Sequence, residues 1–500
     1  MRGISTLSAV RSAFSTSTLC YWTMEDGVVR TSASQLDLRG SAPLDPDRLS
    51  LETCPNLPSV FRLRPFWANV RVVAPGHDLV EAEGCVGDRR WWQAGEHQDA
   101  TFEEAAGRLR HALRTAVERR LGPGGLLGAD LSGGMDSTSL AYLAEAVGGQ
   151  VAHFHAGTAD AQNQDSHFAR RAAAELRGEF MELPSFTTTL DAFATTTRNG
   201  ERSGRSVSGP PAWRANMPHL QMLFEQERAR DIRTHINGLG GDELFALQPA
   251  VMSSLVQSGA VAVGLRSAAR LTRAQRWPVL RTLAAVCSTR TLGAELVARV
   301  HADAGPHADA FGWAPGFGVS RFASAQTRAR VEAQIRGQAS VGIEPHFPDK
   351  ARHQMAESVM FQGEVVRQVN EAFADEGVRW EAPFLDDEIL RLMFGLSSSI
   401  SEGQRHSKPL LAASMKGLAP DWIFSREDKG EYSADLFTAF ASRIDGLKSM
   451  FRESFLIDLD VLNPDAILNA LEMPMLKTQD LFEIEQLATL ELWVREVEGA

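Results

Sequence analysis

The sequence predicts an α/β fold whose main domain is built on a parallel sheet and is preceded by a β-rich N-terminal domain. A short apolar run at 126–131 is followed by a glycine turn, a helical run and a second apolar run at 151–157. This order of strand, turn, helix and strand is typical of a βαβ unit. Residues 1–95 instead alternate short Val-, Leu- and Trp-rich runs with Pro and Gly, which favours β structure. A length of 500 residues leaves room for both domains.

A change of hydrophobic period marks the start of the second domain. From Phe102 to Val117 the apolar residues recur at helical spacing with Arg and Glu between them. The GPGG turn at 122–125 ends this helix, and the largely apolar 126–131 run is typical of a strand covered on both faces. We therefore expect domains at 1–95 and 100–500. Within the second, residues 187–218 are predicted to form a polar, mobile loop, and 250–336 to be helical.

Composition excludes several classes of protein. The chain has 51 Lys and Arg against 63 Asp and Glu, and a net charge of −12 argues against a nucleic-acid-binding surface. It contains no run of eighteen uncharged apolar residues, and its first twenty residues lack the apolar core of a signal peptide. We expect a cytoplasmic protein without nucleic-acid or membrane partners. Four widely spaced cysteines indicate neither a disulfide framework nor a zinc site.

The SGGMDS segment, Ser132–Ser137, is the strongest chemical signal and lies where the predicted strand ending at Leu131 gives way to a helix. Gly133 and Gly134 allow close backbone approach, so successive N–H groups can surround an anion. The two serine hydroxyls add donors, and Asp136 adds an oxygen ligand suited to Mg²⁺. A simple helix-capping turn would explain the glycines and serines but not the acid. The turn has no lysine, which excludes a Walker P-loop.

This segment resembles the SGGxDS pyrophosphate loop of the N-type ATP pyrophosphatases, which cleave ATP between its α and β phosphates to form an adenylate. GLGGDELF at 238–245 and APFLD at 382–386 resemble two further segments of the asparagine synthetase group, in the same order. The resemblance implies that ATP and Mg²⁺ are cofactors. It implies that Leu131, Ser132, Gly133, Gly134, Asp136, Ser137, Gly238, Gly240 and Asp242 line the nucleotide site. Asp136 and Asp242 would hold the metal.

The REDKGEY segment at 426–432 resembles the stretch whose lysine meets the acyl-adenylate in asparagine and β-lactam synthetases. By that resemblance Lys429 is a catalytic residue, although alone it would be interpreted as a surface lysine. β-Lactam synthetases carry a tyrosine where this chain has Leu239, paired with a glutamate where it has Arg379. Glu381 lies two residues further on, on the same face of an extended strand, and is the candidate base. The WEAPFLDDE and REDKGEY segments together resemble the lasso peptide cyclases.

The N-terminus departs from the glutamine-dependent members of this group. They begin Met-Cys-Gly-Ile and use the cysteine as nucleophile, whereas this chain begins Met1, Arg2, Gly3, Ile4. Residues 1–95 therefore resemble a degenerate Ntn-type αββα glutamine amidotransferase-like domain. The resemblance gives 100–500 an adenine nucleotide alpha-hydrolase-like, ATP pyrophosphatase fold with added helices. Without ammonia from glutamine, the amine must arrive with the substrate.

The resemblance implies ATP-dependent macrolactam formation: an Asp or Glu side chain of a core peptide is adenylated, and the N-terminal amine of the peptide displaces AMP. The expected partners are the precursor peptide, a leader peptidase and a leader-recognition protein. Two alternatives remain open. One is a β-lactam synthetase-like or ammonia-dependent amide synthetase acting on a small molecule, which substrate size distinguishes. The other is a catalytically inactive scaffold, which ATP turnover distinguishes.

Overall fold

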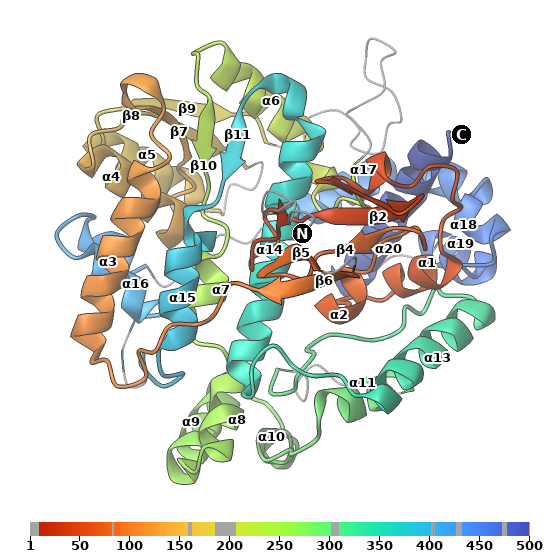
Figure 1. Ribbon diagram of the computed structural model, residues 1–500. Helices are drawn as coiled ribbons and strands as arrows, with labels where there is room; N and C mark the ends of the chain where they lie inside the picture. Colours follow the sequence, from red (N-terminus) through yellow and green to blue (C-terminus); the bar gives the residue numbers. More distant parts are fainter. Residues whose placement is uncertain are drawn as a thin grey trace, which may run out of the picture.

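The computed structural model describes residues 10–82, 85–158, 163–185, 207–301, 310–401, 404, 406–426, 433–472 and 478–499. A five-stranded parallel sheet with strand order β11-β10-β7-β8-β9 forms the centre of the larger part (Figure 1). Its strands are β7 (Leu126–Asp130), β8 (Gln150–Ala156), β9 (Glu179–Leu183), β10 (Thr234–Ile236) and β11 (Arg379–Glu381). The two predicted strands and the predicted βαβ order are confirmed.

Helices surround this sheet as expected for a parallel arrangement. The helix predicted from Phe102 is α3, and it begins at a capping box between Thr101 and Glu104. α4 packs against β7 and β8, and α3 packs against α4. The helices nearest the sheet are α3 (Phe102–Glu118), α4 (Met135–Ala146), α5 (Asp165–Glu175), α6 (Met217–Arg228), α7 (Gly241–Phe245), α14 (Lys350–Ala372), α15 (Asp387–Gly395) and α16 (Pro409–Met415). Short 3₁₀ turns are η1 (Gln35–Asp37), η2 (Pro123–Gly125), η4 (Arg214–Asn216), η5 (Ala374–Glu376), η6 (Pro383–Leu385) and η7 (Asp421–Ile423).

The N-terminal part contains two three-stranded antiparallel sheets with orders β1-β5-β6 and β3-β2-β4. Its elements are β1 (Val10–Arg11), β2 (Tyr21–Glu25), β3 (Val28–Ser32), α1 (Pro46–Glu52), α2 (Ser59–Arg62), β4 (Arg71–Val72), β5 (His77–Ala82) and β6 (Cys85–Arg90). The predicted β-rich character of this part is confirmed. The two short helices and two small sheets do not by themselves establish a four-layered αββα sandwich.

Two buried clusters cross the expected boundary between residues 95 and 100. The Phe14 ring stacks on Trp92 at 3.7 Å, and both rings contact Phe394 of α15. On the other side, Trp67 and Trp493 lie 6.0 Å apart in a core shared with the C-terminal helices. These helices are α17 (Ser433–Arg452), α18 (Phe455–Asp458), α19 (Pro464–Glu472) and α20 (Thr478–Glu498). Aromatic packing therefore joins the N-terminal part both to α15 and to the C-terminal helix α20.

The segment predicted to be helical at 250–336 is largely helical. It forms α8 (Ala250–Gln257), α9 (Val261–Gln275), α10 (Val279–Val286), α11 (Leu292–Val300) and α13 (Ala325–Val341), with α8–α10 at the bottom of Figure 1. Most of the predicted polar loop at 187–218 lies outside the described residues, and its end forms η4 and the start of α6. No helix in the described ranges combines the length and the apolar character needed to cross a bilayer.

Candidate active site

The SGGMDS segment forms the turn from β7 to α4, at the carboxyl edge of the parallel sheet. The Ser132 N–H donates to Ser137 Oγ at 3.1 Å, and the Gly134 N–H donates to Ser132 Oγ at 3.1 Å. The hydroxyls of Ser132 and Ser137 are 2.7 Å apart. Gly134 precedes α4 without a side-chain cap among the described contacts, so the amino end of this helix faces the turn. The internal hydrogen bonds fix the shape of the turn, and the amino end of α4 behind it can receive an anion.

Gly133 is the position in this turn that only glycine fits. Its φ is +79°, and a Cβ there would lie 2.5 Å from the Asp165 carbonyl oxygen and 2.7 Å from the Ala169 nitrogen. The turn therefore packs directly against the amino end of α5. Leu131, just before it, is fully buried and donates its N–H to the Phe154 carbonyl at 2.7 Å. Neighbouring strands thus hold the start of the turn in place.

A second glycine turn, between β10 and α7, meets the first. A Cβ on Gly238 would lie 2.8 Å from the Ser137 nitrogen, and one on Gly241 would lie 2.3 Å from Asp136 Cγ. Gly240, with φ +93°, is the N-cap residue of α7, and Asp242 lies in the first turn of that helix. The missing Cβ atoms let the two turns touch, which brings the two predicted metal-binding carboxylates together.

Lys408 joins these carboxylates and was not anticipated from the sequence. Its Nζ lies 2.7 Å from Asp242 Oδ1 and forms an ion pair with Asp136 Oδ2. The Lys408 side chain is only 7% exposed, whereas that of Asp242 is 51% exposed. The residue precedes Pro409 at the start of α16. One signal in the sequence could have identified it: the chain has only six lysines, so each of them is a candidate functional residue.

The two carboxylates fit a divalent cation. They are hard oxygen donors on separate loops, and they already converge on one positive charge, the Lys408 ammonium. Among the described residues no group of three or more His, Cys, Asp or Glu side chains is set to hold a metal. Asp136 and Asp242 would therefore hold a cation whose remaining ligands come from elsewhere, as Mg²⁺ bound with substrate phosphates requires.

Arg426, the first residue of the 426–432 motif, contacts the turn at Ser132–Ser137, which we call the phosphate turn. It donates to the Gly133 carbonyl at 3.0 Å and pairs with Asp165 at 2.5 Å, and both side chains of this pair are 7% exposed. Its guanidinium also lies 4.3 Å from the centre of the Phe168 ring. Lys429, the predicted catalytic lysine, lies outside the described residues.

Glu381, the candidate base, lies at the end of β11 beside the second turn. Its carbonyl accepts the Asn237 N–H at 2.9 Å. Its carboxylate pairs with Arg120 at 3.1 Å and with Arg379 at 2.5 Å. Arg120 also pairs with Asp386 at 3.2 Å. Two guanidinium groups thus hold the Glu381 carboxylate in the resting structure.

A buried network of charged side chains connects β7 and β10, the strands that precede the two glycine turns. His235 of β10 is fully buried, with Nδ1 2.6 Å from Glu227 of α6 and Nε2 3.0 Å from Asp130 of β7. Burial alone would lower the pKa of His235, but the two carboxylates outweigh it and raise the pKa to about 10. The imidazolium therefore joins β7 and β10, the strands that carry the two glycine turns.

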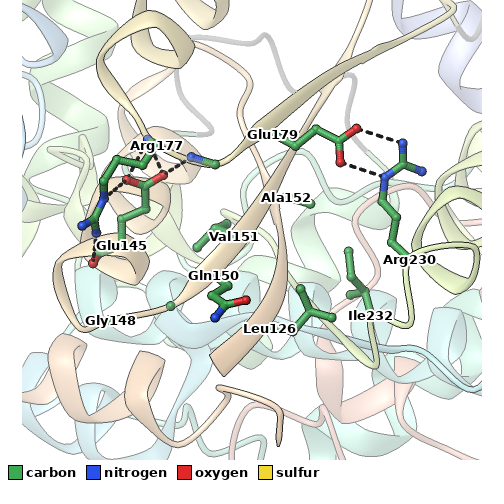
Figure 2. Close-up of a pocket in the computed structure, with 12 residues that line it drawn as sticks. Leu126, Glu145, Gly148, Gln150, Val151, Ala152, Arg177, Glu179, Arg230 and Ile232 are labelled. Atoms are coloured by element: carbon green, nitrogen blue, oxygen red, sulfur yellow. Dashed lines mark hydrogen bonds and ion pairs between the residues drawn. The ribbon is translucent and has the colours of Figure 1, made fainter. Parts of the chain in front are cut away.

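A hollow of about 510 Å³ opens at the opposite, amino edge of the sheet (Figure 2). Figure 2 shows Glu145 with Arg177 and Glu179 with Arg230 at its rim. The Glu145 carboxylate accepts the N–H groups of Arg177 and Gly178, so these contacts hold the end of α4 to the start of β9. In parallel sheets ligands bind outside the carboxyl ends of the strands. We therefore assign the chemistry to the glycine turns and a structural role to this hollow.

A family model described as asparagine synthase matches residues 108–495, a range that includes both glycine turns, Lys408 and Arg426. No curated protein sequence matches the chain.

Proposed function

The chain belongs to the asparagine synthase family, whose members use ATP to form amide bonds, and from that premise we propose that it closes a macrolactam in a peptide. In this reaction an Asp or Glu side chain of a core peptide becomes an acyl-adenylate, and the peptide's own N-terminal amine forms the isopeptide bond. The observation that carries the proposal is the convergence of Asp136, Asp242 and Lys408 on the phosphate turn.

The first half of the proposed reaction takes place at this convergence. The N–H groups and hydroxyls of Ser132–Ser137 bind the triphosphate, and Asp136 and Asp242 would hold magnesium. Magnesium supplies positive charge that offsets the charge on the departing pyrophosphate. The substrate carboxylate attacks the α-phosphorus, and the bond to the β-phosphate oxygen breaks. The Lys408 ammonium, at the same place, can turn to the pyrophosphate oxygens and stabilise their charge.

The second half forms the amide. The peptide amine attacks the acyl carbon of the adenylate, AMP leaves with the electrons of the acyl–oxygen bond, and the nitrogen loses its proton. Lys429, three residues after Arg426 in the sequence, is proposed to stabilise the negative charge of this step. Glu381 pairs with Arg120 and Arg379 in the resting protein, and we propose that it serves as the base. Holding both reacting groups in one folded peptide can contribute about 7–11 kcal/mol.

The residue at position 2 favours an amine supplied by the substrate. Arg2, which lies outside the described residues, replaces the cysteine that glutamine-dependent members need, so we propose that the N-terminal part is a degenerate amidotransferase domain kept as a scaffold. Its aromatic contacts with α15 and α20 are consistent with that role. The precursor peptide, a leader peptidase and a leader-recognition protein are the proposed partners.

The competing function is a β-lactam-type or ammonia-dependent synthetase for a small molecule. The Tyr–Glu dyad of the β-lactam synthetases falls on Leu239 and Arg379. Leu239 packs on the main core, and the Arg379 side chain is 78% exposed and pairs with Glu381. Neither side chain can replace the dyad, which favours the peptide substrate.

The test is a reaction of the full chain with ATP, Mg²⁺ and a leader-free core peptide with a free amine and an Asp or Glu at the ring position. We expect AMP, pyrophosphate and a peptide lighter by one water. A peptide with a blocked N-terminus should still support pyrophosphate exchange but should not close. Amide formation from glutamine, ammonia or a small amino acid, with no reaction of the peptide, would establish the competing function instead.

A further inference from the structure

The helices α8–α10 carry an unusual distribution of charge. Residues 244–294 contain six arginines and no Asp, Glu, Lys or His, in a chain whose net charge is −12. All six arginines are exposed: Arg266, Arg270, Arg273, Arg276, Arg281 and Arg290. This segment is therefore a local positive region on an acidic protein, and its arginine-bearing helices α9 and α10 lie at the bottom of Figure 1, away from α7, which carries Asp242.

The arginines of α9 form one stripe. Arg266, Arg270 and Arg273 have the spacing that places side chains on one face of a helix. The opposite face packs into a small core that includes Ala268, Val286 and Phe311. Because this core fixes the rotation of α9 about its axis, the arginine stripe faces outward.

Internal contacts do not account for this stripe. None of the six arginines forms an ion pair with a carboxylate in the described part of the chain. Arg266 donates to the Ala262 carbonyl of its own helix at 3.0 Å, and Arg270 donates to Ser267 Oγ at 3.2 Å. Like charges at this spacing repel one another and destabilise a helix by about 0.2–0.5 kcal/mol per pair. The stripe thus costs stability within the chain, which points to a role outside it.

Two exposed apolar residues lie beside the arginines. Val279 is 55% exposed and Leu280 is 83% exposed, at the start of α10. They are flanked in sequence by Arg276 and Arg281. Trp277, which precedes them, is partly buried and packs edge-on against Phe311 at 5.8 Å. The packing of Trp277 therefore holds the exposed Val279–Leu280 pair in place beside the arginine stripe.

We propose that α9 and the start of α10 form a docking surface for an acidic, amphipathic segment of a partner protein. Its carboxylates would pair with Arg266, Arg270 and Arg273, since guanidinium groups bind carboxylates through two parallel hydrogen bonds. An apolar side chain of the same segment would cover Leu280. The opposite charges of stripe and segment would speed their association and fix its register.

The structure favours this occupant over two others. A membrane-binding helix turns its apolar face outward, whereas α9 turns that face into the core. It exposes Ala262 before its first arginine and Ala269 between Arg266 and Arg270. A single-stranded nucleic acid would need exposed aromatic rings for stacking, and Trp277 is packed against Phe311. The chain's overall negative charge also disfavours a long polyanion more than a short acidic segment.

The chain offers a natural reporter for the test. Cys287 is exposed and directly follows α10, Cys85 is exposed on β6, and Cys20 and Cys54 are buried. A fluorophore on Cys287, in a Cys85→Ser background, reports binding of a synthetic helical peptide with glutamates on one face and leucines on the next. The same label on Cys85, in a Cys287→Ser background, is the matched control and should not respond.

Three variants separate specific docking from general charge attraction. Replacing Arg266, Arg270 and Arg273 together by Gln should weaken peptide binding about tenfold or more, and Leu280→Ser should weaken it about threefold or more at unchanged charge. The charge-matched control replaces Arg114, Arg228 and Arg336, exposed residues on other helices, and should change binding less than about twofold. ATP–pyrophosphate exchange should be unchanged in all three.

Other results would overturn the proposal. An equal loss in the charge-matched control would show general attraction only, and no effect of Leu280→Ser would remove the apolar contact. Binding of a glutamine-substituted peptide as tight as that of the glutamate peptide would remove the role of charge. Tighter binding of anionic phospholipid vesicles or of single-stranded DNA than of the glutamate peptide would assign the surface to a membrane or a nucleic acid.

Discussion

The Nζ atom of Lys408 lies 2.7 Å from Oδ1 of Asp242, and the same ammonium is paired with Asp136. A residue at the start of α16 thereby neutralises charge on the loops that follow β7 and β10. Two carboxylates brought this close would repel each other without a cation between them. Lys408 therefore stabilises the resting site, at the place where we propose that the triphosphate binds.

We expect Asp136→Ala and Asp242→Ala each to abolish adenylate formation without unfolding the protein. Each change removes one of the two oxygen donors for magnesium, while Lys408 keeps its other carboxylate partner. ATP–pyrophosphate exchange measures the activity, and circular dichroism checks the fold. Exchange near the wild-type rate in either variant would show that the carboxylate is not part of the site.

Lys408→Met should lower exchange and ring closure together, by about 10²–10³, because removing a charged stabiliser of the departing pyrophosphate affects the first step. Lys416→Met provides the control, since this nearby lysine forms no ion pair with a carboxylate in the described part of the chain. Loss of closure with normal exchange in Lys408→Met would move the role of Lys408 to the second step.

Lys429→Met should behave differently from Lys408→Met. If Lys429 acts on the intermediate of amide formation, the adenylate still forms and pyrophosphate exchange persists, while closure slows by about 10²–10³. Lys429→Arg should restore little, because a broad planar guanidinium replaces a compact ammonium. Exchange and cyclised product should be measured on the same preparation. An unchanged closure rate would remove Lys429 from the active site.

Arg426→Gln should destabilise the protein by about 3–5 kcal/mol, because it leaves the buried Asp165 carboxylate without this cation. The double variant Arg426→Gln, Asp165→Asn should recover part of the loss, since the unbalanced charge is gone. Urea denaturation of the two single variants and the double variant gives the coupling. Simple addition of the two single effects would contradict a direct interaction.

The His235 network predicts a loss of stability at alkaline pH. The pKa of His235 is raised from 6.5 to about 10, so the folded protein holds this proton more tightly than the unfolded chain. The resulting stabilisation is fully present below pH 6.5 and is lost as the pH rises toward 10. Urea denaturation across this range should show falling stability, and His235→Gln should flatten the slope. An equally steep slope in the variant would assign the effect to other groups.

Local sequence determined the two strands at β7 and β8, the start of α3 and the phosphate turn. Each depends on backbone conformation within a few residues. The Thr101–Glu104 capping box starts a helix, and the glycine at position 133 permits a φ that other residues rarely adopt. The family motifs also predicted Asp136 and Asp242 as partners, and in the structure both pair with Lys408.

The tertiary structure alone decided which charges meet. Lys408 is 272 residues from Asp136, and Arg426 is 261 residues from Asp165, so neither pair leaves a local pattern in the sequence. The pairing of Glu381 with Arg120, which follows α3, likewise depends on how α3 packs against η6, the turn after β11. The reason is physical: helical period and turn chemistry act between near neighbours, whereas an ion pair requires only proximity in space. The fold creates that proximity by packing distant elements against the carboxyl edge of one sheet.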